Sequence, residues 1–342
     1  MVGSVDGGVA MAEDADRGAR HLVLVHGRDS ARSMVEPEHK SLIDIAAEVM
    51  SDETSRMGIS YSGFCLTGLP HRRLPDNEVW IKRGHKVTLQ VEPGRKGNDY
   101  IGVPFGARAR MILLYLQTQA VRTGSREVEL GRSMRNWLQR MGLAWGGETG
   151  KALREQAKRI AACHLKFSWE GERGNGFDKG GFIRSGFSFH TGAGDERQSA
   201  LWEDWVVLDE AFYEHLRRHP VPLREAALRE LADRSLGLDI YIWLAYRLHN
   251  LDRSTPVRWA ALRDQFGGNG SYSELRVFRR EFRKALAPAV AAYPEAMIEV
   301  KEEGLLLHPS RPPVAPRLVA DVAQQGAEAN PPARRRQTRP SR

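Results

Sequence analysis

The chain has 342 residues, 51 Lys and Arg against 43 Asp and Glu, and a pI of about 9.6. That length allows two domains with sizeable cores, and the basic balance favours an anionic partner, of which nucleic acid is the leading class. No apolar run approaches the roughly 18 residues that span a bilayer, and the N-terminus lacks the order of a secretory signal. We therefore expect a cytoplasmic protein with no membrane partner.

The two cysteines, Cys65 and Cys163, lie far apart in the sequence, and neither has a His or Cys at metal-ligand spacing. We interpret them as reduced, packed thiols. The sequence therefore predicts no disulfide, no metal site and no cofactor.

The N-terminal part begins without a sustained period. Residues 1–38 are rich in Gly, Asp, Arg and small residues, and we predict that they are mostly disordered. Apolar residues on one face predict a helix over 40–50. Two extended stretches follow at 59–67 and 79–92, the second folding on itself around 82–85, and they predict a small sheet.

The stretch 102–170 predicts helix, short strand, helix, helix and strand, in that order. Pro104 opens the first helix, which closes at 123–124. After an extended piece at 128–130, Ser133 caps the second helix, and a glycine-rich turn leads to the third. The residues predicted to face inward on the second and third helices are Met134, Trp137, Leu138, Met141, Leu153, Ala157, Ile160 and Ala161.

The period changes to two after the third helix. Residues 164–170 and 182–190 alternate between apolar and polar, and the segment 171–181 between them is rich in glycine and charge. This pattern predicts a hairpin. Helix, strand, helix, helix and hairpin are the order of a winged helix-turn-helix.

The same order restarts beyond a linker predicted at 191–199. Residues 202–208 extend, Asp209 caps a short helix that runs to Arg218, and Pro222 opens another. Ser235 begins the most apolar helix of the chain. It should be the buried central helix of a second domain.

The rest of the second copy follows the first in order. Pro256 opens its second helix, and Ser271 and Glu274 have capping-box spacing at the start of its third. Pro288 is expected to end or kink that helix near Ala287. Residues 297–308 then form a hairpin in the place of a wing.

The C-terminal tail is rich in proline and carries the cluster Arg334–Arg336, so we predict a disordered basic segment. The predicted fold is α+β. Its parts are a disordered segment at 1–38, a first winged-helix domain with a preceding helix and small sheet at 39–190, the linker at 191–199, a second winged-helix domain at 200–308 and the tail at 309–342.

Two stretches resemble a known family. GVPFGARARMILLYLQTQAVRTGSREVELGRSMRNWLQRMG and LDIYIWLAYRL are similar to segments of the RepA-type plasmid replication initiator proteins, which carry two winged helices in tandem. The resemblance covers about residues 55–308 and is strongest from 100 to 170. It implies binding to direct repeats of double-stranded DNA at a plasmid origin, opening of the adjacent DNA, recruitment of host helicase or initiator proteins, and an active form that is either a monomer or a homodimer.

The third helix of the second copy carries the clearest candidate DNA-reading face. Its outward positions are polar, basic or small, and we see no acid among them; Arg can pair with guanine and Val can touch a thymine methyl. A solvated basic face is the alternative. The predicted DNA contacts here are Ser273, Arg276, Val277, Arg280, Arg283 and Lys284.

The first copy gives a weaker signal. On its third helix the candidates are Lys151, Arg154, Glu155, Lys158 and Arg159, and Glu155 could simply pair along the helix with Lys151 or Arg159. In its predicted wing, phosphate contact and ordinary hairpin charge are equally good interpretations of the basic side chains. These are Lys166, Arg173, Lys179 and Arg184.

Catalytic interpretations fit less well. The segment 146–151 lacks the first Gly and the Ser or Thr of a phosphate loop. His215, Arg218 and either Tyr241 or Tyr246 faintly resemble the residues of DNA strand-transfer enzymes, but both tyrosines lie in the apolar helix, where packing is the expected role. We therefore predict no catalytic residue, and a winged-helix transcriptional repressor is the main alternative to an initiator.

Overall fold

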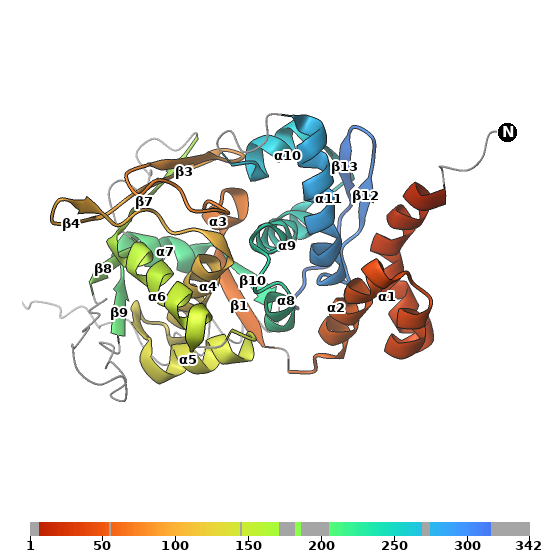
Figure 1. The fold of residues 1–342 in the computed structure, drawn as a ribbon, viewed down its shortest axis with the longest axis horizontal. Coiled ribbons are helices and arrows are strands. Elements are labelled where there is room, and N and C mark those ends of the chain that lie inside the picture. The colour runs from red at the N-terminus through yellow and green to blue at the C-terminus, as the bar shows by residue number, and fades with distance from the viewer. Residues whose placement is uncertain are drawn as a thin grey trace, which may run out of the picture.

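The computed structural model in Figure 1 describes residues 7–54, 56–143, 146–170, 182–185, 205–268 and 274–315. Its fold is mixed α+β, with helices packed around small antiparallel sheets. In the first half the elements are α1 (Gly7–Ser33), η1 (Pro37–His39), α2 (Lys40–Ser51), β1 (Met57–Tyr61), α3 (Ser62–Leu66), β2 (Trp80–Arg83), β3 (Val87–Glu92), β4 (Arg95–Lys96), β5 (Asp99–Tyr100), α4 (Gly106–Thr123), β6 (Glu127–Glu129), α5 (Gly131–Arg140), α6 (Gly147–Ala162), β7 (His164–Trp169), β8 (Ile183–Ser185) and β9 (Trp205–Leu208).

The second half begins after β9. Its elements are α7 (Glu210–Arg218), β10 (Pro220–Arg224), α8 (Glu225–Glu230), α9 (Ser235–Arg247), η2 (Leu248–Asn250), β11 (Thr255–Arg258), α10 (Trp259–Phe266), α11 (Leu275–Ala291), β12 (Ile298–Val300) and β13 (Gly304–Leu307). Within it, Asp209 caps α7 as predicted, because its carboxylate accepts hydrogen bonds from two backbone N–H groups of the first turn.

The N-terminal helix α1 contradicts the predicted disorder of residues 1–38. It packs against α2, and the two lie side by side in Figure 1. The small side chains of Ala19 and Ala31 are buried, and Arg28 Nε lies 3.0 Å from the carboxylate of Asp44 on α2. Small residues and ion pairs therefore hold α1 against α2. Because few large apolar residues are involved, the sequence shows no helical apolar period here.

The helix α4 is the centre of the first half, as the sequence predicted. It begins at Gly106 rather than Pro104 and ends where Gly124 adopts a left-handed φ of +63°. Figure 1 shows it beside β1 and α6, and it also contacts α9. The Thr118 hydroxyl and the Gln117 amide oxygen accept hydrogen bonds from backbone N–H groups of β1, at 2.8 and 2.7 Å. These buried polar groups hold β1 on the helix.

The two helices predicted after α4 are present. The predicted inward residues of α5 and α6 are buried, except that Ala161 is half-buried. The backbone of Ser133 lies inside α5, so the prediction that Ser133 is the cap was wrong. The helix starts two residues earlier, at Gly131, directly after the buried Leu130.

The strand β7 does not form the predicted hairpin with β8. It pairs with β3 in a sheet of order β2-β3-β7, whereas β8 pairs with β9 in a sheet of order β6-β9-β8. The antiparallel register places Leu165 opposite Val91 and Phe167 opposite Leu89, so the buried faces of β3 and β7 coincide. Residues 171–181 and 186–190 of the predicted hairpin lie outside the described residues.

The strand β9 confirms the extended stretch predicted within 202–208, but it joins the first half of the molecule. The sequence assigned this stretch to the start of the second domain, and β9 instead pairs with β6 and β8. Alternation predicts a strand but not its partner, which explains the difference. The predicted linker at 191–199 lies outside the described residues.

Two prolines predicted to open helices lie in strands instead. Pro222 is in β10, which pairs with β1, and α8 begins after it at Glu225. Pro256 is in β11, and α10 begins at Trp259. Both strands lie at sheet edges, where a residue without an N–H is tolerated. Each proline therefore marks the strand that precedes a helix.

The helix α11 starts later and runs further than predicted. Glu274 stands directly before it rather than at its third position, so the predicted capping box does not form, and Ser271 lies outside the described residues. The helix continues through Pro288 to Ala291. Pro288 removes only one backbone N–H in the last turns, and its buried ring packs in the core.

The first residues of the tail are ordered on the body of the protein, although the sequence predicted disorder from residue 309. Val314 is buried, the Tyr293 hydroxyl donates a hydrogen bond of 2.7 Å to the Arg311 carbonyl, and the Met297 N–H donates one of 3.0 Å to the Ser310 hydroxyl. Residues 316–342 lie outside the described residues.

Candidate nucleic-acid interface

The outward face of α11 gathers three of the predicted DNA contacts. The side chains of Arg276, Arg280 and Lys284 are 86%, 62% and 68% exposed and follow one another at every fourth residue. Val277 and Arg283 are half-buried at the flanks. The opposite face buries Phe278, Phe282 and Leu286 in the core, which fixes the orientation of the helix. Ser273 lies outside the described residues.

The prediction that this face has no acid was wrong. Glu281 Oε1 lies 2.9 Å from Arg280 Nε and 3.6 Å from Lys284 Nζ, and Glu274 lies 3.7 Å from Arg276. The hydrogen bond from Arg280 lowers the pKa of Glu281. Exposed pairs of this kind contribute little. A DNA phosphate can therefore replace these carboxylates as the partner of each cation.

The outward face of α6 is more mixed. Lys151 is exposed and its ammonium lies 2.8 Å from Glu148, one turn away. Lys158 is exposed, and Arg154 and Glu155 are half-buried. The structure thus brings the predicted residues of α6 onto one helix but gives them fewer exposed cations than α11.

Arg159 was wrongly predicted to contact DNA. Its side chain is only 4% exposed, with Nη2 2.9 Å from the Asp76 carboxylate and Nη1 donating a hydrogen bond of 3.2 Å to the Val103 carbonyl. Its guanidinium also stacks over the Phe105 ring, 5.3 Å from the centroid. The segment before α4 covers this flank of the helix, which the helical period could not reveal. Arg159 therefore holds the first half together.

The predicted wing of the first half is only partly described. Lys166 is half-buried on β7, opposite Gln90 of β3. Arg184 lies on β8, where only the path of the strand is described. Arg173 and Lys179 lie outside the described residues, so phosphate contact by this group stays a prediction.

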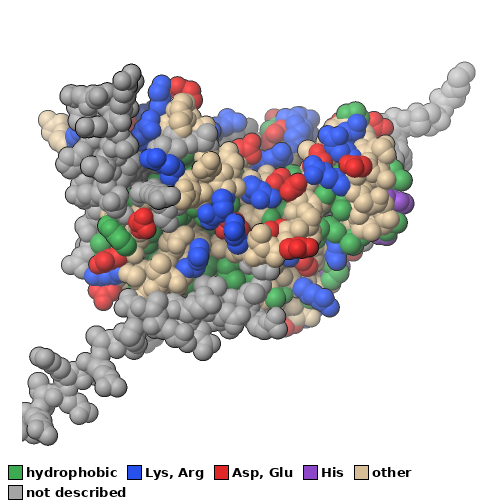
Figure 2. All heavy atoms as spheres, turned by 90° about the horizontal axis from the view of Figure 1, so that it is seen from below, with side chains coloured by type: hydrophobic (Ala, Val, Ile, Leu, Met, Phe, Trp, Pro, Cys, Tyr) green, Lys and Arg blue, Asp and Glu red, His purple; other side chains and the backbone are tan. Residues whose placement is uncertain are grey.

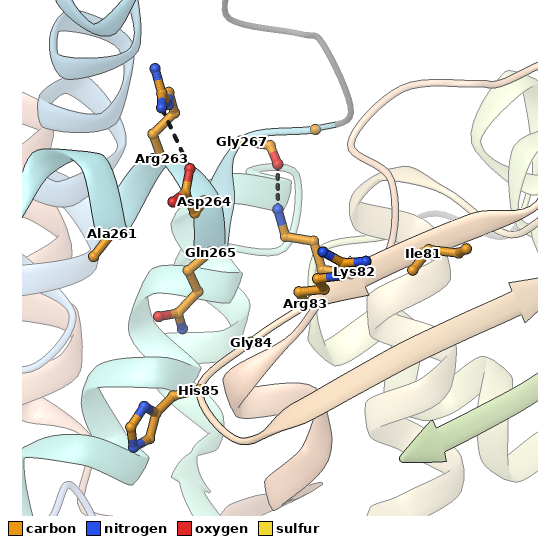
Figure 3. A pocket seen from close by; sticks show the side chains of 11 residues that line it. Ile81, Lys82, Arg83, Gly84, His85, Ala261, Arg263, Asp264, Gln265 and Gly267 are labelled. Carbon is orange, nitrogen blue, oxygen red and sulfur yellow. Dashed lines mark hydrogen bonds and ion pairs between the residues drawn. The ribbon is translucent and has the colours of Figure 1, made fainter. Parts of the chain in front are cut away.

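Basic residues that the sequence analysis did not select line a cavity of about 820 Å³ between the β2–β3 turn and α10 (Figure 3). Lys82 and Arg83 lie at the end of β2, His85 lies in the turn that follows, and Arg263 comes from α10. The sequence presented residues 82–85 only as a hairpin turn. Because the cavity joins segments far apart in the chain, no local pattern could have identified it.

Elsewhere, charges of both signs are mixed. Figure 2 shows Lys and Arg side chains close to Asp and Glu on the face seen from below. Such a face has no large field of one sign. The basic clusters on α11 and at the β2–β3 turn are therefore the more specific candidates for binding an anion.

A comparison with family models matches residues 103–261 to the C-terminal region of "Plasmid encoded RepA protein". The matched segment runs from the residues before α4 through α10, and it contains both stretches in which the sequence resembles this family. The match covers just under half of the chain and agrees with the resemblance to plasmid replication initiators.

Two solved structures are similar to this chain. Crystal structures of domains 2 and 3 of RctB match with TM-scores of 0.47 and 0.42, each at 12% identity. The first covers 74% of this chain and 99% of the RctB chain, and the second covers 72% and 95%. No protein of curated function matches the chain.

The two tyrosines considered for strand transfer lie in different environments. Tyr241 is fully buried, its hydroxyl accepts a hydrogen bond of 3.0 Å from the Arg224 N–H, and burial raises its pKa. A buried, neutral phenol that is already hydrogen-bonded is poorly placed to attack DNA. Tyr246 is half-buried and lines a cavity of about 350 Å³ with His215.

The described residues also bear on the predictions about cysteines, metal sites and membrane spans. Cys65 and Cys163 are both buried thiols, as predicted, and burial raises their pKa. Over the described residues, no three His, Cys, Asp or Glu side chains gather in a way that could hold a metal ion. The described helices are also too short or too polar to cross a membrane.

Proposed function

We propose that this protein initiates plasmid replication by binding repeated DNA sites at the origin through two tandem winged helices. In the proposal, binding promotes opening of the adjacent DNA, and the bound protein recruits host replication proteins such as the helicase. The action is non-catalytic, because binding energy alone distorts the DNA. The match of residues 103–261 to the plasmid-encoded RepA family model supports the initiator role.

The second winged helix spans α9 to β13. Its support is the element order α9, β11, α10, α11, β12, β13 together with the sheet order β11-β13-β12. In a winged helix the third helix enters the major groove and the last hairpin lies on the flanking backbone. These roles fall to α11 and to the hairpin of β12 and β13.

The single observation that carries the proposal is the exposed face of α11. Arg276, Arg280 and Lys284 project along the side of the helix opposite its buried aromatic residues. Cations at this spacing can meet the phosphates on both sides of a groove while an arginine reaches a guanine edge. We assign sequence reading mainly to this helix.

The first winged helix spans α4 to β9, with α6 as its groove helix. Its order of helix, strand, helix and helix matches that of the second unit, and β6 pairs with a later strand, as β11 does in the second unit. Lys151 and Lys158 of α6 then contact phosphates. Two groove helices on one chain suit a long site, such as one of several direct repeats.

A nuclease footprint on the DNA around the gene tests this proposal. Protection of several short direct repeats beside an A·T-rich stretch is the expected result. Protection of a single inverted repeat over a promoter would instead favour the transcriptional repressor. Incubation with nicked DNA addresses catalysis, because a covalent adduct that survives denaturation would overturn the non-catalytic role.

A further inference from the structure

The cavity between the β2–β3 turn and the end of α10 contains a buried cation. Lys82 is only 5% exposed, and its ammonium donates a hydrogen bond to the carbonyl of Gly267, which follows α10 (Figure 3). An ammonium has three N–H donors. Over the described residues, no carboxylate lies within ion-pair distance of Lys82, and Asp239 and Asp264 act on its charge only from further away.

A second donor in the cavity wall is also unused. The side-chain nitrogen of Gln265 is buried and has no hydrogen-bond partner in the described part of the chain. Buried polar groups are nearly always paired, and a buried charge costs free energy unless an opposite charge accompanies it. Lys82 and Gln265 therefore each present a donor that an acceptor oxygen of an anion would satisfy, and the two side chains point to different parts of the cavity (Figure 3).

The remaining charges of the cavity point to the same ligand. Arg83 at the end of β2 and His85 in the following turn are exposed, and Arg263 lines the cavity from α10 with its guanidinium turned away from them (Figure 3). The only acid among the described lining residues is Asp264, which lies 3.6 Å from Arg263 and is largely exposed. Positive charge thus exceeds negative charge around the open side of the cavity.

We propose that this cavity binds a phosphate of the DNA backbone, with Lys82 as the buried counter-ion and Arg83 and His85 closing over the strand. The inference rests on the proposed function, since α10 immediately precedes the groove helix α11. A strand that flanks a groove occupied by α11 passes this end of α10. The β2–β3 turn lies outside the family match to residues 103–261. It would then be a third segment that contacts DNA, in addition to α6 and α11.

The variant Lys82→Met tests the buried charge. Methionine keeps most of the aliphatic stem and removes the cation, and relief from an unpaired buried charge offsets the lost hydrogen bond to the Gly267 carbonyl. We expect unchanged or higher thermal stability and DNA binding about 10- to 100-fold weaker at fixed salt, the range for losing a hydrogen bond to a charged group. Lower stability with unchanged DNA affinity would show that Lys82 only ties the hairpin to α10, and would overturn the proposal.

The double variant Arg83→Ala and His85→Ala tests the exposed basic residues of the cavity and leaves the buried Lys82 unchanged. The plot of log affinity against log salt should become shallower by about 0.9 for each phosphate that the variant no longer neutralises. Arg56→Ala is the matched control, because Arg56 is exposed and lines a different cavity, and its slope should equal that of the wild type. Equal slopes for all three proteins would contradict the phosphate site.

The same donors could also bind a free phosphate ion instead of a phosphate of DNA. Inorganic phosphate is the probe for this alternative. If phosphate at millimolar concentration stabilises the wild type but not Lys82→Met, while Lys82→Met binds origin DNA normally, the cavity serves a small ligand and the DNA assignment fails. Different results would contradict the proposed function itself. These are that the wild type binds no origin repeat, or that variants of α11 keep the wild-type ratio of specific to random DNA affinity.

Discussion

At the scale of single residues, burial decides the role of each arginine. Arg280 and Arg159 both lie on the third helix of a unit, outside its apolar stripe. Arg280 is exposed beside Glu281, whereas Arg159 is buried against Asp76 and Val103. The difference arises because the segment before α4, which is distant in sequence, covers this flank of α6, whereas the corresponding face of α11 is exposed.

Arg276→Ala and Arg280→Ala should each weaken binding to the preferred site by about 1–3 kcal/mol and affect random DNA much less, because in the proposed function each arginine pairs with a base edge. Lys158→Ala should weaken both about equally. Affinities at fixed salt measure the ratio, and thermal unfolding should shift by no more than about 0.5 kcal/mol for these exposed positions. A reduced ratio in the Lys158 variant, with a normal ratio in both arginine variants, would reverse the roles of α6 and α11.

Arg159→Ala should lower the free energy of unfolding by about 1–3 kcal/mol, because it removes the donor to the Val103 carbonyl and leaves Arg73 as the remaining arginine at Asp76. The folded variant should still discriminate specific from random DNA as the wild type does. Urea unfolding gives the free energy of unfolding. DNA titrations at a temperature below the unfolding midpoint give the ratio of specific to random affinity. A stable variant that no longer discriminates would return Arg159 to the DNA interface.

Lys82 links stability and binding to pH in opposite directions. Burial lowers its pKa from 10.5 to about 8, while Asp239 and Asp264 act to raise it, and Arg110 and His71 are the other charged or titratable groups nearby. Between pH 8 and 10.5 the folded protein binds fewer protons at Lys82 than the unfolded chain, so its contribution to stability rises with pH. DNA affinity should fall over the same range, because the neutral amine no longer attracts a phosphate.

The difference between wild type and Lys82→Met isolates this group from the other residues that titrate there. Chemical unfolding and DNA binding at about pH 7, 8 and 9 provide the measurement, with the pH window set by the lowered pKa of about 8. If both proteins show the same pH dependence of DNA affinity, Lys82 does not meet the ligand.

At the scale of elements, periodicity predicted most helices and strands but not the pairing of the strands. The apolar faces of α4, α6 and α9 confirm the helical predictions, since their spacing requires one buried side. The alternation in β7 fits any partner with a matching buried face, and β3 rather than β8 supplies it. Proline was ambiguous for the same reason, because it suits both a helix start and an edge strand.

Truncation separates the two parts of the tail. Cutting after His308 removes Val314 and the hydrogen bonds of Ser310 and Arg311, and it should lower stability by about 1–3 kcal/mol, near the value for burying one valine. Cutting after Ala315 should leave the free energy of unfolding and the footprint unchanged. Equal unfolding curves for both truncated proteins would show that residues 309–315 contribute nothing.

At the scale of the whole molecule, a buried ion pair joins the two halves. Both Nε and Nη2 of Arg110 on α4 lie 2.6 Å from the carboxylate oxygens of Asp239 on α9, and the same guanidinium donates to the Leu69 carbonyl at 2.7 Å. The pairing of β1 with β10 adds a second link. The central helices of the two units are therefore held in one orientation, which suits reading a site of fixed spacing.

Binding should depend strongly on salt. If the two units together make about 6–10 phosphate contacts, affinity for the origin site should fall by roughly 10³ to 10⁵ between 50 and 200 mM salt. Titrations of a single repeat across that range measure the slope. A flat response would exclude a footprint that involves both units.

The sequence by itself determined the helices with a continuous apolar face, the second hairpin, the basic balance and the resemblance to a plasmid initiator family, because each depends on local spacing or composition. Tertiary structure alone decided which strand β7 joins, that Arg159 is buried, that α1 packs on α2, and that Lys82 is buried opposite α10. Those features depend on residues far apart in the chain. The free energy of each contact depends on the burial and the neighbouring groups that distant segments supply.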